Sequence, residues 1–292
     1  MKVKSKILTI FSMAILLILS GCNMPLIHTK GLVATAERDL MITAVLLMLI
    51  VVIPVFVMTF VFAWKYRASN PKGKYSPNWT HSTALEIVWW GIPIIIIAIL
   101  GTITWITTHE LDPYKPLDVP AQPMKIQVVA LNWKWLFIYP EQNIATVNFV
   151  EFPSHVPIEF DITADAPMNS FWIPQLGGQI YAMTGMQTKL HLIADEDGDY
   201  EGLSSNYSGA GFSWMRFIAR TTTVDGFNQW AKTVKQSPNR LSMAEYDELR
   251  KDSENNPVKY YSNVERGLFS DIMMKFMGPA SQDHNSMPSM SM

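Results

Sequence analysis

Uncharged apolar residues are concentrated in three runs within the first 110 positions. Residues 7–19 form a mostly apolar run that is too short to cross a bilayer comfortably. Residues 40–64 and 87–108 contain no charged side chain, and as helices these 25 and 22 residues would span roughly 37 Å and 33 Å. Two transmembrane helices are therefore predicted, with Pro54 and Pro93 inside them, as membrane helices tolerate.

The charges around these runs predict an orientation. The short connector, 65–86, carries Lys65, Arg67, Lys72 and Lys74, which places it in the cytoplasm by the positive-inside rule. The segments before the first span and after the second span have no such basic excess. We expect a helical hairpin with both of its ends outside the cytoplasm.

The beginning of the chain has the pattern of an export signal. Lys2, Lys4 and Lys6 precede the first apolar run, and Leu-Ser-Gly-Cys stands at 19–22, where that run ends. This ending resembles a bacterial lipobox, which implies removal of residues 1–21 and acylation of Cys22. An ordinary signal peptide followed by a chance cysteine is the alternative. Because Cys22 is the only cysteine, no disulfide and no site with two cysteines is available.

The outer part of the chain has the pattern of a β-domain. Four prolines make residues 109–123 a stiff linker after the exported N-terminal segment, 22–39, and the hairpin. Short β-branched and aromatic segments between turn residues then predict strands and a cupredoxin-like β-sandwich or Greek-key domain over 124–223. The predicted strands are 126–131, 133–139, 145–152, 158–163, 189–193 and 214–219.

Residues 224–277 predict an aromatic-rich region of short helices. Asp225 is expected to cap one helix, Ser242 with Glu245 forms a capping box for another, and 264–277 is a third apolar segment. Whether the aromatic side chains of this region pack on the β-domain or on a partner is left open by the pattern.

The last residues, 278–292, are polar and predict a disordered tail. They contain His284, Met287, Met290 and Met292, residue types that bind copper. The spacing of these side chains is loose, so a metal-binding tail is the weaker of the two interpretations.

Composition agrees with this organisation. Only 16% of the residues are charged, below the roughly 25% of soluble chains. The net charge of −2 argues against a nucleic-acid partner, which would require a basic surface.

Two motifs give the β-domain a family resemblance. Residues 132–140, Asn-Trp-Lys-Trp-Leu-Phe-Ile-Tyr-Pro, and 169–177, Asn-Ser-Phe-Trp-Ile-Pro-Gln-Leu-Gly, resemble subunit II of the haem–copper oxidases, as does the two-span hairpin. In the cytochrome c oxidases of that family, this subunit holds a two-copper centre with a histidine in the second motif and Cys-x3-Cys-x3-His-x2-Met in a loop.

The matching loop here, 200–215, keeps the spacing of that centre and loses its ligands. The positions of the copper ligands hold Asn169, Ser204, Asn206, Ser208 and Phe212, and only Met215 keeps a ligand-capable side chain. Copper of this kind requires soft thiolates and imidazoles, which hydroxyl, amide and phenyl groups do not replace. We expect no metal in this domain and a core or loop role for Met215.

Loss of the copper ligands, together with the lipobox, resembles subunit II of the cytochrome bo-type ubiquinol oxidases. The resemblance implies oxidation of ubiquinol coupled to reduction of dioxygen to water, with proton pumping. It implies that haems and copper lie in subunit I and that this chain binds no cofactor. The expected partners are subunit I, the other integral membrane subunits and membrane lipid, in a bacterial cytoplasmic membrane with the β-domain on the periplasmic side.

Glu86 opens the second apolar run and is the candidate functional side chain of the hairpin. An acid at a bilayer boundary is costly unless it is hydrated or paired. In the family that the chain resembles, a glutamate at this motif position lies at the mouth of a proton channel into subunit I. The alternative is an interfacial glutamate paired with a connector lysine.

Two other functions remain open at this point. One is a copper-bearing subunit of a cytochrome c oxidase, which the replaced ligands disfavour. The other is a stand-alone lipoprotein binding module on a cupredoxin scaffold, which leaves Glu86 unexplained.

Overall fold

The computed structural model describes residues 24–71 and 77–277 and divides them into two compact units. One unit comprises residues 38–112. The other comprises residues 24–37 together with 113–277, and it contains every strand that the structure describes. Signal residues 1–21, Cys22, connector residues Lys72 and Lys74, and the tail 278–292 lie outside the described residues.

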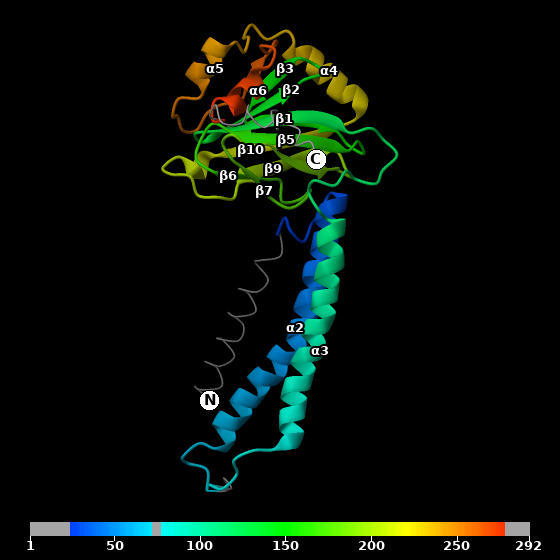
Figure 1. Cartoon of the computed structure of the whole chain (residues 1–292), viewed down its shortest axis with the longest axis vertical. Coiled ribbons are helices and arrows are strands. Elements are labelled where there is room, and N and C mark those ends of the chain that lie inside the picture. Colours follow the sequence, from blue (N-terminus) through cyan, green and yellow to red (C-terminus); the bar gives the residue numbers. More distant parts are fainter. Residues whose placement is uncertain (1–23, 72–76, 278–292) are drawn as a thin grey trace, which may run out of the picture. The chain divides into compact units, whose positions relative to one another are not determined.

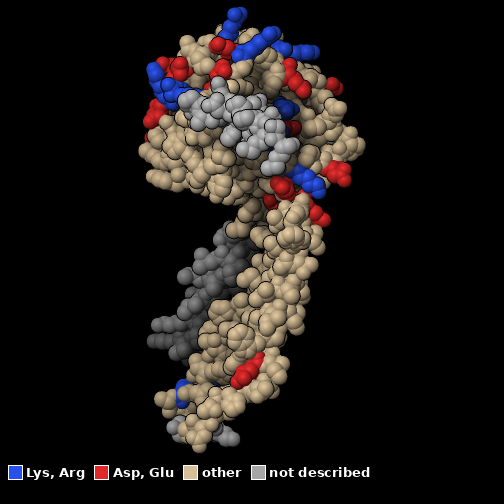
Figure 2. All heavy atoms as spheres, viewed as in Figure 1, with Lys and Arg blue, Asp and Glu red and all other residues tan. Residues whose placement is uncertain are grey.

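The helical unit contains α3 (Thr83–Glu110) and α2 (Leu32–Lys65) from Arg38 onward, both long and apolar, while the first six residues of α2 belong to the β-unit. At 1.5 Å per residue they extend roughly 51 Å and 42 Å, so both are long enough to cross a bilayer. Their most apolar windows are exposed to the surroundings, unlike the core helices of a soluble protein. Figure 2 shows few charged side chains on them, whereas Lys, Arg, Asp and Glu gather on the β-unit.

Both helices extend beyond the predicted uncharged runs, 40–64 and 87–108. Helix α2 begins eight residues earlier, so Glu37, Arg38 and Asp39 are helical. Helix α3 begins at Thr83 and places Glu86 in its first turn. Helical hydrogen bonding continues through polar residues at the ends of an apolar run, and for that reason charge alone does not mark the helix ends.

The β-unit is a sandwich of two mixed sheets (Figure 1). The first sheet has the order β11-β3-β2-β1-β5-β8 and the second has the order β4-β10-β9-β6-β7. Neighbouring strands are antiparallel except for β1 with β5 and β4 with β10. The strands are β1 (Met124–Leu131), β2 (Lys134–Tyr139), β3 (Ile144–Val147), β4 (Phe149–Pro153), β5 (Ile158–Ala164), β6 (Asn169–Trp172), β7 (Ile180–Ala182), β8 (Thr188–Leu192), β9 (Gly198–Ser204), β10 (Arg216–Thr222) and β11 (Lys259–Tyr261).

Aromatic side chains fill the space between the sheets. The Phe171 ring stacks on the Phe217 ring with centroids 5.2 Å apart, and the Trp135 and Phe160 rings approach Phe171 to 5.3 Å and 5.2 Å. All four side chains are buried. Ring contacts of this kind add about 0.5–1.5 kcal/mol per pair to the burial of apolar area.

The C-terminal region packs on the outer face of the first sheet. Helices α5 (Met243–Leu249) and α6 (Leu268–Met274) cover β1 to β3 (Figure 1), and β11 pairs with β3. Tyr246, Leu268 and Phe269 join a second apolar core with Leu136 and Ile138 of β2. The aromatic-rich region therefore docks on the sandwich, which answers the question that the sequence left open.

Buried polar contacts reinforce this docking. The Lys134 ammonium group donates hydrogen bonds to the carbonyl oxygens of Leu249 and Lys251, each at 2.8 Å. Burial lowers the pKa of Lys134. The Tyr246 hydroxyl donates to Asp165 at 2.8 Å, and Lys275 pairs with the same carboxylate.

The predicted fold class, two apolar helices followed by a β-sandwich with short C-terminal helices, is confirmed. Several local expectations were wrong. The predicted strand 145–152 is two strands, because Asn148 between them has a φ of 55°. Trp214 lies in the short 3-10 helix η1 (Phe212–Trp214) rather than in a strand.

Capping also differs in part from the prediction. Helix α4 (Val224–Val234) is capped by Thr223, whose hydroxyl oxygen accepts from the Gly226 amide, while Asp225 lies in its first turn. In the predicted box, Ser242 does accept from the Glu245 amide at 3.3 Å. The Glu245 carboxylate instead pairs with Lys259 at 2.6 Å, since β11 brings that lysine close.

The carboxyl group of Glu151 on β4 is buried, and few interactions stabilise its charged form. Glu151 is 3% exposed and accepts a long hydrogen bond of 3.3 Å from the Thr222 hydroxyl. Arg220, its partner in the parallel register, is paired with Asp199 at 2.6 Å and 2.8 Å. Burial raises the pKa of Glu151 from 4.5 to about 7, although Arg220 opposes the shift.

This carboxyl group predicts a pH-dependent stability. Between pH 4.5 and about 7 the folded chain binds a proton that the unfolded chain has lost, so the free energy of unfolding should fall as pH rises through that window. Glu151→Gln should flatten this fall, as measured by denaturant unfolding of the β-unit at successive pH values. Glu201→Gln, at an exposed position on β9, is the control and should retain the wild-type profile. An unchanged profile in Glu151→Gln would contradict the assignment.

Candidate functional site

Three of the six positions that the resemblance matches to copper ligands meet where β9 ends beside β6. Asn169 is the first residue of β6 and Ser204 is the last of β9, and both are buried. The Ser204 hydroxyl lies 2.9 Å from Asn169 Oδ1, to which it donates, and 3.2 Å from the carbonyl oxygen of Asn206. The structure therefore brings three of the predicted positions into one hydrogen-bonded group.

The amide groups of this cluster are also directed to backbone partners. Asn169 Nδ2 donates to the Pro167 carbonyl at 2.7 Å, and Asn206 Nδ2 donates to the Met168 carbonyl at 3.0 Å. The Ser204 amide donates to the Met215 carbonyl at 3.1 Å. These bonds join the ends of the loop to each other and to the start of β6.

The remaining predicted positions point to different surroundings. Met215 is 1% exposed and belongs to the core of the sandwich. The Phe212 ring packs against Tyr207, with 5.6 Å between centroids. The Ser208 hydroxyl oxygen is buried and has no hydrogen-bond partner among the described residues.

The Trp133 side chain packs against residues 208–211 of the 200–215 loop, a contact that the sequence analysis missed. Trp133 lies in the tight turn between β1 and β2 with a φ of 60°, and its indole nitrogen donates to the Ser208 carbonyl at 3.1 Å. Its ring lies so close to Gly211 that an added Cβ would be 2.4 Å from Cδ2. The glycines at 209 and 211 were the feature of the sequence that could have indicated this contact, because a side chain at 211 would displace the Trp133 ring.

This set of donors does not fit a redox copper centre. Two neutral amides and two hydroxyls offer hard oxygen donors, and hydrogen bonds hold Asn169, Ser204 and Asn206 to each other and to the backbone. Within 24–71 and 77–277, no group of three or more His, Cys, Asp or Glu side chains could hold a metal ion.

Glu86 lies in the first turn of α3, where its amide donates to the Ser82 carbonyl at 2.9 Å. Its side chain is half-buried, and no ion pair joins it to any residue in the part of the chain that the structure describes. Lys72 and Lys74, two connector lysines of the alternative interpretation, lie outside the described residues.

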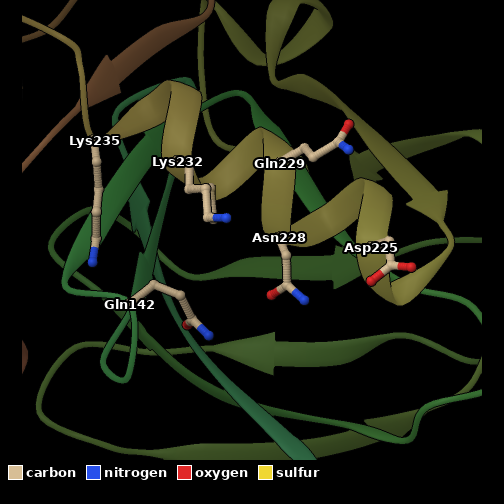
Figure 3. Close-up of a pocket in the computed structure, with 7 residues that line it drawn as sticks. Gln142, Asp225, Asn228, Gln229, Lys232 and Lys235 are labelled. Atoms are coloured by element: carbon tan, nitrogen blue, oxygen red, sulfur yellow. The ribbon is translucent and has the colours of Figure 1, made fainter.

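A polar hollow of about 460 Å³ beside α4 is a separate feature (Figure 3). Gln142 reaches it from the turn after β2, and the other labelled side chains come from α4 and from Lys235, the residue that follows it. Its polar lining is Gln142, Asp225, Asn228, Gln229, Lys232 and Lys235. This lining has mixed charge and no nucleophile beside a base, so the hollow is not a candidate catalytic site.

Comparison with known proteins gives a consistent result. The chain is 58% identical to the cytochrome bo(3) ubiquinol oxidase subunit 2 of Pseudomonas aeruginosa, over 91% of this chain and 80% of the relative. It is 50% identical to the ubiquinol oxidase subunit 2 of Acetobacter aceti, over 89% of this chain and 85% of the relative.

The chain belongs to the ubiquinol oxidase subunit 2 family.

A family model and a solved structure also match parts of the chain. Residues 235–280 match the model described as the COX Aromatic Rich Motif. This range contains α5 and α6, which cover the first sheet, and β11, the edge strand of that sheet. A solved structure, the periplasmic domain of subunit II of a cytochrome oxidase from Bradyrhizobium japonicum, matches with 21% identity and a TM-score of 0.38, over 39% of this chain and 95% of that chain.

The hydrogen bond between Ser204 and Asn169 predicts a measurable cost of removal. Ser204→Ala leaves the buried Asn169 oxygen without its donor, which should lower the free energy of unfolding by about 1–3 kcal/mol. Denaturant unfolding of the β-unit measures this loss. Ser213→Ala, at an exposed position of η1, should change the stability by less than about 0.5 kcal/mol. Equal unfolding midpoints for the two variants would contradict the role of Ser204.

Proposed function

We propose that this chain is subunit II of a proton-pumping respiratory ubiquinol oxidase in a bacterial cytoplasmic membrane. The complex would oxidise ubiquinol and reduce dioxygen to water. The relatives named ubiquinol oxidase subunit 2, which align over about nine tenths of the chain, support this function. The observation that distinguishes it from a copper-bearing cytochrome c oxidase subunit is the Ser204–Asn169 pair at the place of two copper ligands.

Within such a complex the chain would be a structural subunit without a redox centre of its own. Haems and copper would then belong to subunit I, and electrons from ubiquinol would reach them without passing through the β-sandwich. His81 and His109 lie outside the two predicted apolar runs, which therefore contain no histidine to ligate a haem. The two apolar helices offer subunit I and the other integral subunits a packing surface in the membrane.

The proposed topology follows from charge and from the export signal. Lys65, the last residue of α2, and Arg67, just after it, support a cytoplasmic connector, and the β-sandwich would then be periplasmic. Acylation of Cys22 would give the mature chain a lipid at its periplasmic N-terminus.

Isolation of the assembled complex tests the main proposal. Affinity purification through this chain in mild detergent should recover a large haem-bearing polypeptide, and the preparation should consume oxygen with ubiquinol. Recovery of the chain without haem would contradict the proposal and favour a stand-alone binding module.

We further propose that Glu86 loads protons into a channel of subunit I from the cytoplasmic side. Glu86→Ala should slow oxygen reduction without loss of assembly, by less than the roughly 100-fold that loss of a catalytic acid or base costs. Oxygen consumption per haem measures the effect. Glu110→Ala, an exposed glutamate at the other end of α3, is the matched control and should keep full turnover. Unchanged turnover in assembled Glu86→Ala would contradict this role.

The lipid on Cys22 should be redundant as an anchor. Each CH₂ buried in the bilayer contributes about 0.8 kcal/mol, but two apolar helices already hold the chain there. Cys22→Ser should remain entirely in the membrane fraction, with its signal segment left uncleaved, as judged by fractionation and intact mass. Recovery of Cys22→Ser in the soluble fraction would contradict this expectation.

A further inference from the structure

Residues 28–37, here called the N-terminal strap, are joined to the β-sandwich by backbone hydrogen bonds. The Lys30 amide donates to the Gln175 carbonyl at 2.8 Å, and the Lys30 carbonyl accepts from the Asp195 amide at 2.8 Å. The Ala34 amide donates to the Leu176 carbonyl at 3.1 Å. The strap is thus held by two separate loops, 173–178 and 193–196.

Close packing makes this attachment rigid. Gly31 lies so near the sandwich that an added Cβ would be 2.5 Å from the Ile193 carbonyl oxygen. Val33 and Ala34 are buried, and Val33 belongs to the sandwich core. Detachment of the strap would expose part of this core, so the strap and the sandwich move together.

An apolar turn precedes the strap and is not covered by the described chain. In residues 24–27 the amides of Ile27 and His28 donate to the Met24 carbonyl at 3.0 Å and 3.2 Å. The side chains of Met24, Leu26 and Ile27 are 55%, 43% and 44% exposed. Between them stands only Pro25, so the turn has neither a charged side chain nor a hydrogen-bonding one.

The apolar turn follows directly on the proposed acylation site. Since a residue spans at most about 3.6 Å of chain, an acylated Cys22 would hold Met24 within about 7 Å and Ile27 within about 18 Å of itself. The acyl chains must lie in the bilayer, and exposed apolar side chains at that distance gain from leaving water for lipid.

We propose that Met24, Leu26 and Ile27 insert into the outer lipid leaflet beside acylated Cys22. The inserted turn holds the strap, and through it the 173–178 and 193–196 loops, at the membrane surface. The lipid then sets the position of the β-sandwich rather than anchoring the chain. This inference rests on the proposed acylation of Cys22.

The chemistry of the turn favours lipid over a protein partner. Protein interfaces are enriched in aromatic side chains, methionine and arginine, with about one hydrogen bond per 100–200 Å². Of these residue types the turn has only Met24. The turn offers thioether and aliphatic groups alone. The next ammonium group along the chain, that of Lys30, is paired with Glu196 at 2.6 Å.

Photocrosslinking in native membranes tests the inference. A diazirine analogue of leucine is placed at Leu26 in the full-length chain, the membranes are irradiated, and the N-terminal peptide is analysed by mass spectrometry. Phospholipid adducts should form several-fold more often than with the same analogue at Val258. That control position is also apolar and 45% exposed, but it lies far from Cys22 along the chain.

The same peptide reports the two claims separately. Acylated Cys22 with phospholipid adducts at Leu26 supports the inference. Acylated Cys22 with protein adducts alone, or with lipid adducts no more frequent than at Val258, overturns the inference and leaves the acylation standing. Unmodified Cys22 overturns the acylation, and the adducts at Leu26 then decide the membrane contact by themselves.

Discussion

Burial of β1 and β2 on both faces is the constraint on which the rest of the β-unit depends. Trp135 and Phe137 point into the space between the sheets, whereas Leu136 and Ile138 point to the second core. Neither face would be stable in water alone, because a large apolar area would remain exposed. The C-terminal region is therefore required to complete the fold, and the buried contacts of Lys134 hold its 249–253 segment in place.

The same strands position the loop that lost its copper ligands. The turn between β1 and β2 carries Trp133 onto the loop, and β6 and β9 bring Asn169 to Ser204. What would be a metal site in a cytochrome c oxidase subunit is here a closed, hydrogen-bonded end of the sandwich. The Ser204–Asn169 pair at this place supports the proposal that the chain has no redox centre of its own.

The sequence predicted the parts of the fold whose residues carry a strong local pattern. The two apolar helices and strands such as β1, β2 and β5 follow from long uncharged runs and from β-branched and aromatic segments. Strand β11 was missed because its three residues are strand only through pairing with β3. The break at Asn148 was missed because it depends on one positive φ, which the side chain stabilises by accepting from the Trp135 amide.

The candidate site was predicted through a resemblance rather than through periodicity. No local pattern places Asn169 beside Ser204, 35 positions apart, but the spacing of the family motif does. The contact of Trp133 with residues 208–211 was missed because it depends on how the two sheets pack on each other. Strand β9 was missed because its last residues fall in the predicted ligand loop, 200–215, and β6 was missed because its four residues were interpreted only as part of the 169–177 motif.

The central claim is that this loop is closed and binds no copper. Its most direct test is a titration of the purified, assembled complex with copper, followed by hydrogen exchange of the amides from Ser204 to Met215. The account predicts that exchange in this segment is the same with and without copper. Copper-dependent protection of these amides, with about two coppers taken up per chain, would contradict it.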